Sequence, residues 1–221
     1  MFNHIKAANR YKETLFLAFL SFISFSFSVF RLIYTDSHIF LFLNWNLFLA
    51  FIPWLFSSII VVYPNLRKRK LALVMLVLLW LLFFPNAPYI LTDLFHLGNN
   101  KSMPIWFDLV LILSFAWTGL LFGIMSLWDI ESLLKTRLNK YLVRGISVAL
   151  LFLGAYGIYV GRYLRWNSWD IITEPIELLF NIGRSLKSPI EHPGAWAMSI
   201  LMGIFLNMIY WSFHLIKNRQ E

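Results

Sequence analysis

Hydrophobic residues form long runs along this 221-residue chain, and short polar segments separate the runs. An α-helix needs roughly 20 apolar residues to cross a bilayer, and six runs reach about that length. They cover about residues 14–34, 39–63, 71–91, 105–127, 141–163 and 195–216. Because lipid offers no hydrogen bonds to a backbone, each run is predicted to be a membrane-spanning helix. The predicted fold class is all-α, a polytopic transmembrane bundle in which residues 1–221 form a single integral membrane domain.

The composition excludes a soluble domain. Hydrophobic residues make up 59% of the chain and charged residues only 14%, more apolar surface than a soluble domain of this size can bury. The chain has no cysteine, which excludes disulfides and thiolate sites. A basic start before the first apolar run also fits a signal peptide, but the run is long and no small-x-small cleavage site follows it. We expect an uncleaved first helix.

The basic residues predict the topology. A net charge of +8 would suggest nucleic acid as the partner of a soluble protein, but here the charges are grouped by loop, and no nucleic-acid partner is predicted. Of 19 Lys and Arg residues, 13 fall in the N-terminus, the 64–70 loop, the 129–144 loop and the C-terminal tail. The positive-inside rule then puts both termini in the cytoplasm and the conspicuous polar motifs on the other side.

The third run ends in a polar motif, FPNAPYILTDLFHL (residues 84–97). Pro85 and Pro88 cannot continue a smooth helix, so the third helix is predicted to be broken here. Asn86 is a good N-cap and Gly98 a good terminating residue, so the motif itself is predicted to form a short separate helix.

The polar residues of this motif share one side of such a helix, within about 120°. They are Asn86, Tyr89, Thr92, Asp93 and His96. One interpretation is an interfacial helix whose polar face lies in water. The other is a buried or pocket-lining face, in which Asp93 and His96 act as base and acid, and Asn86 and Tyr89 contact the ligand.

A second polar segment, RYLRWNSWD, follows the fifth run. Arginine and tryptophan at the headgroup level are common membrane anchors, which explains each residue singly. In combination, Arg162 and Arg165 offer bidentate donors to a phosphate or carboxylate, with Asn167 and Asp170 beside them.

Asn46 inside the second run and Asp108 at the start of the fourth are further candidate binding residues. Unsatisfied amides are costly in hydrocarbon, so Asn44 and Asn46 are expected to hydrogen-bond to another helix. The spacing of Asp93 and His96 gives only a weak metal signal, and no metal site is predicted. The sequence identifies no cofactor.

Pro175 begins an amphipathic segment between the fifth and sixth runs. Ile176, Leu179, Phe180 and Gly183 share one helical face, which predicts a helix lying flat on the outer leaflet. A connector of this kind is one interpretation, and a lateral lid over the site is the other.

Several motifs together resemble a family of bacterial multi-pass membrane proteins that is catalogued only as a domain of unknown function. The resemblance rests on NLFLAFIP (46–53), the 84–97 motif, Trp106-Phe107-Asp108 and GIYVGRYLRWNSWD (157–170), and it spans roughly residues 44–210. It implies a bacterial inner-membrane location, and it implies no activity, substrate or cofactor.

Three classes of function stay open. The leading hypothesis is an extracytoplasmic interfacial site for an anionic headgroup, such as a phospholipid or polyprenyl phosphate, in an envelope enzyme. A transporter or channel for a small solute is the alternative. The broken helix favours it, but few ionisable groups lie at mid-depth. The third is a non-catalytic scaffold or assembly protein. A closed outer pocket would favour the first, a midplane cavity the second and a dry polar cluster the third.

The two polar motifs are predicted to form one site. Both follow spans that end on the same side of the membrane, and a carboxylate near the membrane is costly without a partner. We therefore expect Asp93 or Asp170 to pair with Arg162 or Arg165, with His96 and Asn167 completing the hydrogen bonds.

Overall fold

The computed structural model describes residues 10–98, 102–187 and 193–218. Of the described residues, 85% are helical and none lies in a strand. Within the part of the chain that the structure describes, six helical segments are long and apolar enough to cross a membrane, which confirms the predicted fold class. The chain divides into two compact units, Met1–Ile130 and Glu131–Glu221. The prediction of a single domain is not decided by this division.

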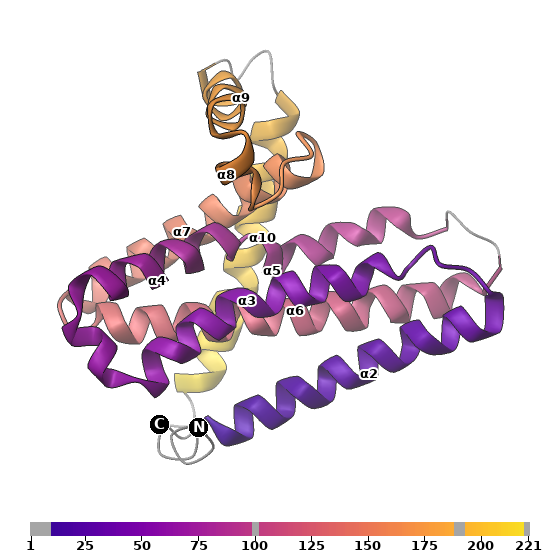
Figure 1. The fold of residues 1–221 in the computed structure, drawn as a ribbon, viewed down its shortest axis with the longest axis horizontal. Helices are drawn as coiled ribbons and strands as arrows, with labels where there is room; N and C mark the ends of the chain where they lie inside the picture. Colours follow the sequence, from indigo (N-terminus) through magenta and orange to yellow (C-terminus); the bar gives the residue numbers. More distant parts are fainter. Residues whose placement is uncertain (1–9, 99–101, 188–192, 219–221) are drawn as a thin grey trace. The chain divides into compact units, whose positions relative to one another are not determined.

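Unit 1 contains four of the six spans (Figure 1). Its elements are α2 (Tyr11–Thr35), α3 (Phe42–Val62), η1 (Pro64–Lys68), α4 (Lys70–Phe83), α5 (Asn86–Tyr89), η2 (Ile90–His96) and most of α6 (Ile105–Leu134). The third span is broken as predicted, because α4 ends before Pro85 and the chain continues through α5 and η2. Fully buried apolar side chains gather on α6, among them Leu111, Phe115 and Leu127.

The broken third span packs closely on α6 through two glycines. A Cβ added to Gly119 would lie 2.8 Å from the carbonyl oxygen of Ala87, and one added to Gly123 would lie 3.0 Å from the Ala87 Cβ. Small residues allow such close backbone approach in membrane proteins. These two glycines, one helical turn apart, therefore make room for α5.

The helix α6 is longer than the sequence suggests. The fourth span was expected to end near residue 127, with a polar loop over 129–144, but α6 continues to Leu134 and α7 begins at Lys140. The expected loop was wrong for residues 129–134 and 140–144, which are helical. Helix α6 can continue past residue 128 because the carboxylates of Asp129 and Glu131 are satisfied by partners inside their own units. Polar residues therefore do not end this helix.

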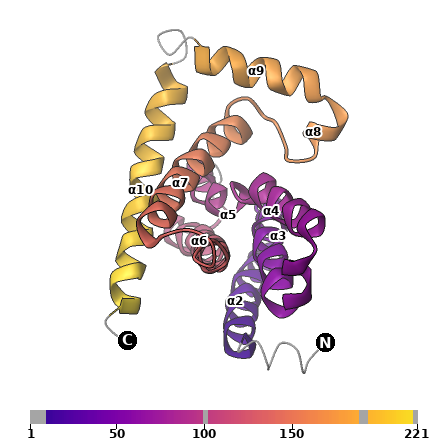
Figure 2. The ribbon, with the colours of Figure 1, turned by 90° about the vertical axis from the view of Figure 1, so that its left-hand side faces the viewer.

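Unit 2 contains the end of α6, α7 (Lys140–Arg162), α8 (Asp170–Thr173), α9 (Pro175–Lys187) and α10 (Pro193–Asn218). The helices α7 and α10 run side by side (Figure 2). Gly203 of α10 faces the ring of Phe152, and a Cβ at this glycine would overlap that ring. The sequence offered no sign of which helix Gly203 would contact.

The predicted amphipathic helix is α9. Its outer face exposes Ile176, Leu179 and Phe180, with Ile176 84% exposed. Its inner face is fixed to α7 by Ser185, whose hydroxyl lies 2.6 Å from the hydroxyl of Tyr156. The helix is therefore held on its own unit by one face and leaves an apolar face uncovered. Its place on the outer leaflet stays a prediction.

Candidate functional site

The 84–97 motif forms tighter helical turns than expected. The stretch from Ile90 to His96 is a 3-10 helix, in which residues three apart lie on the same face. Asp93 therefore shares its face with Ile90 and His96, and not with Tyr89. Gly98 follows with φ 85°, a conformation that favours glycine.

The predicted cap at Asn86 was wrong. Asn86 is the first residue of α5, and its side-chain amide donates to the carbonyl oxygen of Phe83, 3.0 Å away. This hydrogen bond satisfies an acceptor at the end of α4, because Pro85 interrupts the backbone pattern there. The residue therefore connects the two halves of the broken helix.

The polar side of the motif is buried in the protein. Thr92 and Asp93 are fully buried, whereas Phe95 on another side is exposed. The interpretation of a polar face in water was therefore wrong for these two residues, and the interpretation of a buried face fits them. Asn86, Tyr89 and His96 are partly exposed.

Asp93 contacts Asn46. The side-chain amide of Asn46, in the second turn of α3, donates to Oδ2 of Asp93 over 2.8 Å. The expectation that Asn46 bonds to another element is confirmed, and so is that for Asn44, which donates to Ser28 of α2 over 2.9 Å. Two candidate site residues, 47 positions apart, therefore meet. Beside them, the ring of His96 packs edge-on against Phe42.

Asp108 pairs with Arg31 of α2. Nε and Nη2 of the guanidinium lie 2.7 and 3.2 Å from the two carboxylate oxygens, and both side chains are only 1% exposed. The ring of Phe40 covers the guanidinium, and the ring centroid lies 4.4 Å from Cζ of Arg31. A bidentate pair of this kind neutralises both charges in a low-dielectric environment.

These three connections lie at one end of unit 1, and we call them the polar layer: Arg31–Asp108, Ser28–Asn44 and Asn46–Asp93. Together they join α2, α3, η2 and α6. Such contacts fix the register of the helices, because a displaced helix would leave a buried polar group unsatisfied. The carboxylates of Asp93 and Asp108 are shielded from water, so catalysis at Asp93 would require the layer to open. The acid and base roles of Asp93 and His96 stay a prediction.

In unit 2, the 162–170 segment forms an ordered loop after α7. The backbone N–H of Trp166 donates to the carbonyl of Val160 over 3.2 Å. Oδ2 of Asp170 accepts from the backbone and side-chain nitrogens of Asn167, over 2.6 and 3.3 Å. Arg165 is exposed and adopts φ 59°, one of two positive values among the described non-glycine residues.

The prediction that the two motifs form one site joins residues of different units. Asp93 and His96 belong to unit 1, and Arg162, Arg165, Asn167 and Asp170 belong to unit 2. This prediction therefore stays untested. Within the described parts of the chain, no three His, Asp or Glu side chains are grouped so that they could hold a metal ion.

Sequence reasoning missed several buried polar residues. Arg31, near the end of the first apolar run, was not selected as a site residue, yet it is the partner of Asp108. At the opposite end of unit 1, Nη1 of Arg10 lies 2.5 Å from Asp129, and Ser57 donates to the same carboxylate over 2.6 Å. The signal available was a charge placed inside or beside an apolar run, which usually requires a partner.

Unit 2 has a similar buried carboxylate. Glu131 accepts hydrogen bonds from Ser147 of α7, over 2.6 Å, and from the hydroxyl of Tyr210 of α10. Lys135 lies 3.8 Å from its other oxygen. Each unit is therefore held by carboxylates of α6 that contact neighbouring helices.

This architecture is that of a multi-pass α-helical membrane protein. Within that class, the chain belongs to the family described as "Protein of unknown function (DUF1361)", which matches residues 45–209, more than half of the chain. The matched region contains both polar motifs. No curated protein and no solved structure matches the chain.

Proposed function

We propose that this protein binds an anionic membrane lipid through Arg162, at the end of α7, and Arg165, in the loop that follows. The observation that carries the proposal is the exposed Arg165, on a left-handed backbone that non-glycine residues rarely adopt. Such a conformation persists only where the surrounding structure holds it, and residues of this kind gather at binding sites.

The loop around Arg165 is preorganised by hydrogen bonds. The contacts of Trp166 with Val160 and of Asp170 with Asn167 fix the backbone on the C-terminal side of the arginine. A loop whose backbone is already ordered loses less conformational entropy on binding, and a guanidinium can offer two parallel donors to a phosphate. Arg162 stands three residues earlier, in the last turn of α7.

The elements after the loop favour a position at the headgroup level. Ile172 of α8 and Ile176 of α9 are more than 80% exposed, which is unfavourable in water. A helix between two membrane spans can bury such a face at the boundary of headgroups and acyl chains. The loop would then lie beside the lipid phosphates.

We further propose that the site faces the extracytoplasmic side of a bacterial cell membrane. The distribution of 13 of the 19 basic residues supports this orientation. Polyprenyl phosphates present the same chemistry as phospholipid headgroups, so the ligand class includes both. An enzymatic reaction on the lipid would require Asp93 and His96 as base and acid. Lipid binding at the arginines does not require such a reaction.

A non-catalytic scaffold is the second candidate, favoured by the polar layer of unit 1. Its carboxylates and amides are buried and hydrogen-bonded to one another, which suits a structural role. In this case the lipid would stabilise the protein without being converted.

The experiment compares lipid binding by Arg165→Asn and Arg137→Asn. Asparagine tolerates φ near 60°, so the first variant removes the guanidinium and preserves the backbone. Arg137 is also exposed but lies in the 135–139 connection, so its variant controls for the loss of charge. Full-length protein in nanodiscs would be titrated with phosphatidylglycerol, phosphatidylcholine and a polyprenyl phosphate.

We expect Arg165→Asn to weaken binding of the phosphatidylglycerol or polyprenyl phosphate by about tenfold, the value of a charge-assisted hydrogen bond. Arg137→Asn should bind like wild type. Equal losses in both variants would indicate non-specific electrostatics, and no loss in either would overturn the proposal.

A further inference from the structure

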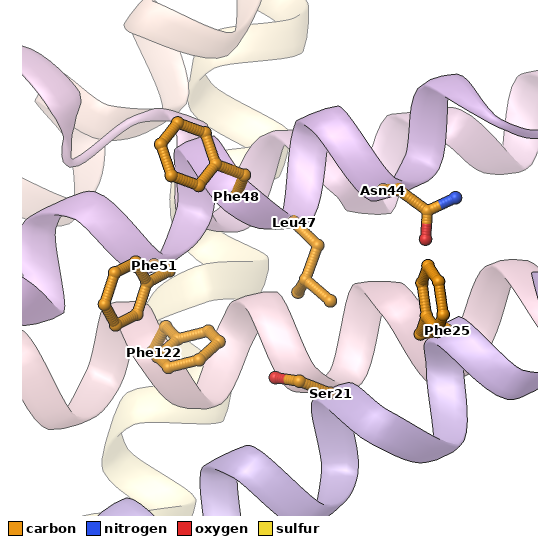
Figure 3. A pocket seen from close by; sticks show the side chains of 7 residues that line it. All are labelled: Ser21, Phe25, Asn44, Leu47, Phe48, Phe51 and Phe122. Carbon is orange, nitrogen blue, oxygen red and sulfur yellow. The ribbon is translucent and has the colours of Figure 1, made fainter.

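A groove opens between α2 and α3 in unit 1 and is closed behind by α6 (Figure 3). Its volume is about 380 Å³. We call it the α2/α3 groove. Its wall consists of Leu47, four phenylalanines (Phe25, Phe48, Phe51 and Phe122) and the polar residues Ser21 and Asn44. The rings of Phe51 and Phe122 meet edge to face at one end, and Asn44 and Phe25 lie at the other.

The hydrogen-bond donors in the wall are bonded inside the protein. The amide nitrogen of Asn44 donates to Ser28 and to the carbonyl oxygen of Leu41. The hydroxyl of Ser21 donates to the carbonyl oxygen of Leu17 over 2.8 Å. Water in a buried site needs two to four polar partners, and apolar cavities instead take up apolar ligands. The chemistry of the groove therefore favours hydrocarbon.

The position of the groove indicates the source of that hydrocarbon. Both helices at its mouth are membrane spans, and Phe25 and Phe48 on its rim are about half exposed. Trp45, beside Asn44, and Trp106, at the start of α6, are also exposed, and exposed tryptophans mark the membrane interface. The groove thus runs from the interface at Asn44 inward to Phe51.

A second copy of the chain fits this surface less well. Helices in membranes associate through small residues that let their backbones approach, whereas the rim here carries phenylalanine. A narrow, flexible acyl chain can enter between the rings and restore the contacts that an empty groove lacks.

We propose that the α2/α3 groove binds one acyl chain of a membrane phospholipid. The proposal does not rest on the headgroup site, because all residues of the groove belong to unit 1 and Arg165 belongs to unit 2. Either site could fail its test while the other is retained.

The test is a pair of variants on α2, Ser21→Phe and Ser26→Phe. Both serines donate to the carbonyl four residues earlier over 2.8 Å, but only Ser21 lines the groove. The full chain would be reconstituted in phosphatidylethanolamine vesicles with a tracer phospholipid that carries a diazirine midway along one acyl chain. After illumination, mass spectrometry measures labelling of α2 and α3 peptides relative to α10 peptides.

In the wild type, labelling should be concentrated on the α2 and α3 peptides. Ser21→Phe fills the groove and should lower this preference by about tenfold, equivalent to losing contact with roughly two methylene groups. Ser26→Phe should keep it. Uniform labelling of all exposed helices in the wild type, or wild-type labelling of Ser21→Phe, would overturn the proposal.

A second variant tests the proposal independently in case Ser21→Phe does not fold. Phe48→Ala removes a half-exposed ring from the rim and leaves the helix intact. It should also reduce the labelling preference, because the chain loses one side of its contact. If this variant is folded and labels like wild type, the ring has no ligand and the proposal fails.

Discussion

Replacing Gly119 with alanine tests the packing that positions the 84–97 motif. The added Cβ would lie 2.8 Å from the carbonyl oxygen of Ala87 and 2.9 Å from Cδ1 of Ile90. The isoleucine can change its rotamer, but the oxygen belongs to the backbone of α5 and cannot turn away. We therefore predict that Gly119→Ala displaces α5 from α6 and destabilises the protein.

The size of the effect follows from two opposing terms. Forcing an extra methyl into a packed interface costs about 1–3 kcal/mol. Replacing glycine by alanine within a helix returns up to about 1 kcal/mol. Gly145 of α7 provides the matched control, because a Cβ there would have no neighbour within 4 Å. The gain from replacing glycine by alanine within a helix is common to both variants. The difference between their free energies of unfolding, about 1–3 kcal/mol, therefore measures the cost of the extra methyl at the α5–α6 contact.

The assay is unfolding of the full chain in detergent, followed by far-UV circular dichroism. We expect Gly145→Ala to be as stable as wild type or slightly more so. Gly119→Ala should unfold at a midpoint lower by about 2–4 °C for each kcal/mol lost, on the scale known for soluble proteins of this size. If the two variants unfold at the same midpoint temperature, α5 does not approach α6 closely at Gly119, and the reasoning is refuted.

Three further predictions concern other contacts. Arg31→Met should lower the free energy of unfolding by about 3–5 kcal/mol because it leaves Asp108 unpaired, and adding Asp108→Leu should recover most of this loss. A double variant that is no more stable than Arg31→Met in the same unfolding assay would contradict the pairing. Gly203→Ala should be destabilising because its Cβ overlaps the ring of Phe152, and Phe152→Leu should relieve it; a midpoint for Gly203→Ala equal to wild type would disprove the contact. A reporter fused after Glu221 should be active only in the cytoplasm, and activity outside would refute the predicted topology.

The helices could be predicted because a bilayer leaves the backbone few choices. A run of about 20 apolar residues must satisfy its own hydrogen bonds, so hydropathy alone identifies the spans. The break in the third span could also be predicted, since a proline cannot continue a regular helix. Both features depend on the local sequence, and the structure has both, although α6 continues past the end expected for the fourth span.

The partners of the polar residues could not be predicted in the same way. The sequence shows that Asn46 needs a hydrogen bond, but it does not show that Asp93 supplies it. Arg31 looks like an interfacial loop charge until α6 places Asp108 beside it. Because these contacts join residues 47 and 77 positions apart, they follow from the packing of whole helices.

The local geometry of the motif was also beyond a simple helical projection. At 100° per residue, Tyr89 and Asp93 share a face, but the turns from Ile90 onward are 3-10. The change rotates Asp93 toward α3 and leaves Phe95 exposed. After a proline-rich interruption of this kind, the geometry of the next turn depends on the helices that pack against it.

Arg10, directly before α2, and Arg31, within it, have a consequence for the biogenesis of the protein. Arg10 and Arg31 are 21 residues apart, as are their partners Asp108 and Asp129 on the antiparallel α6, a helical length of about 31 Å that matches the hydrocarbon core. Arg31 is synthesised 77 residues before Asp108, and Arg10 is synthesised 119 residues before Asp129. Until α6 is inserted, both guanidiniums must therefore rest among lipid headgroups at opposite surfaces. The first helix can enter the membrane early, but it reaches its final partners only after the fourth span has been made.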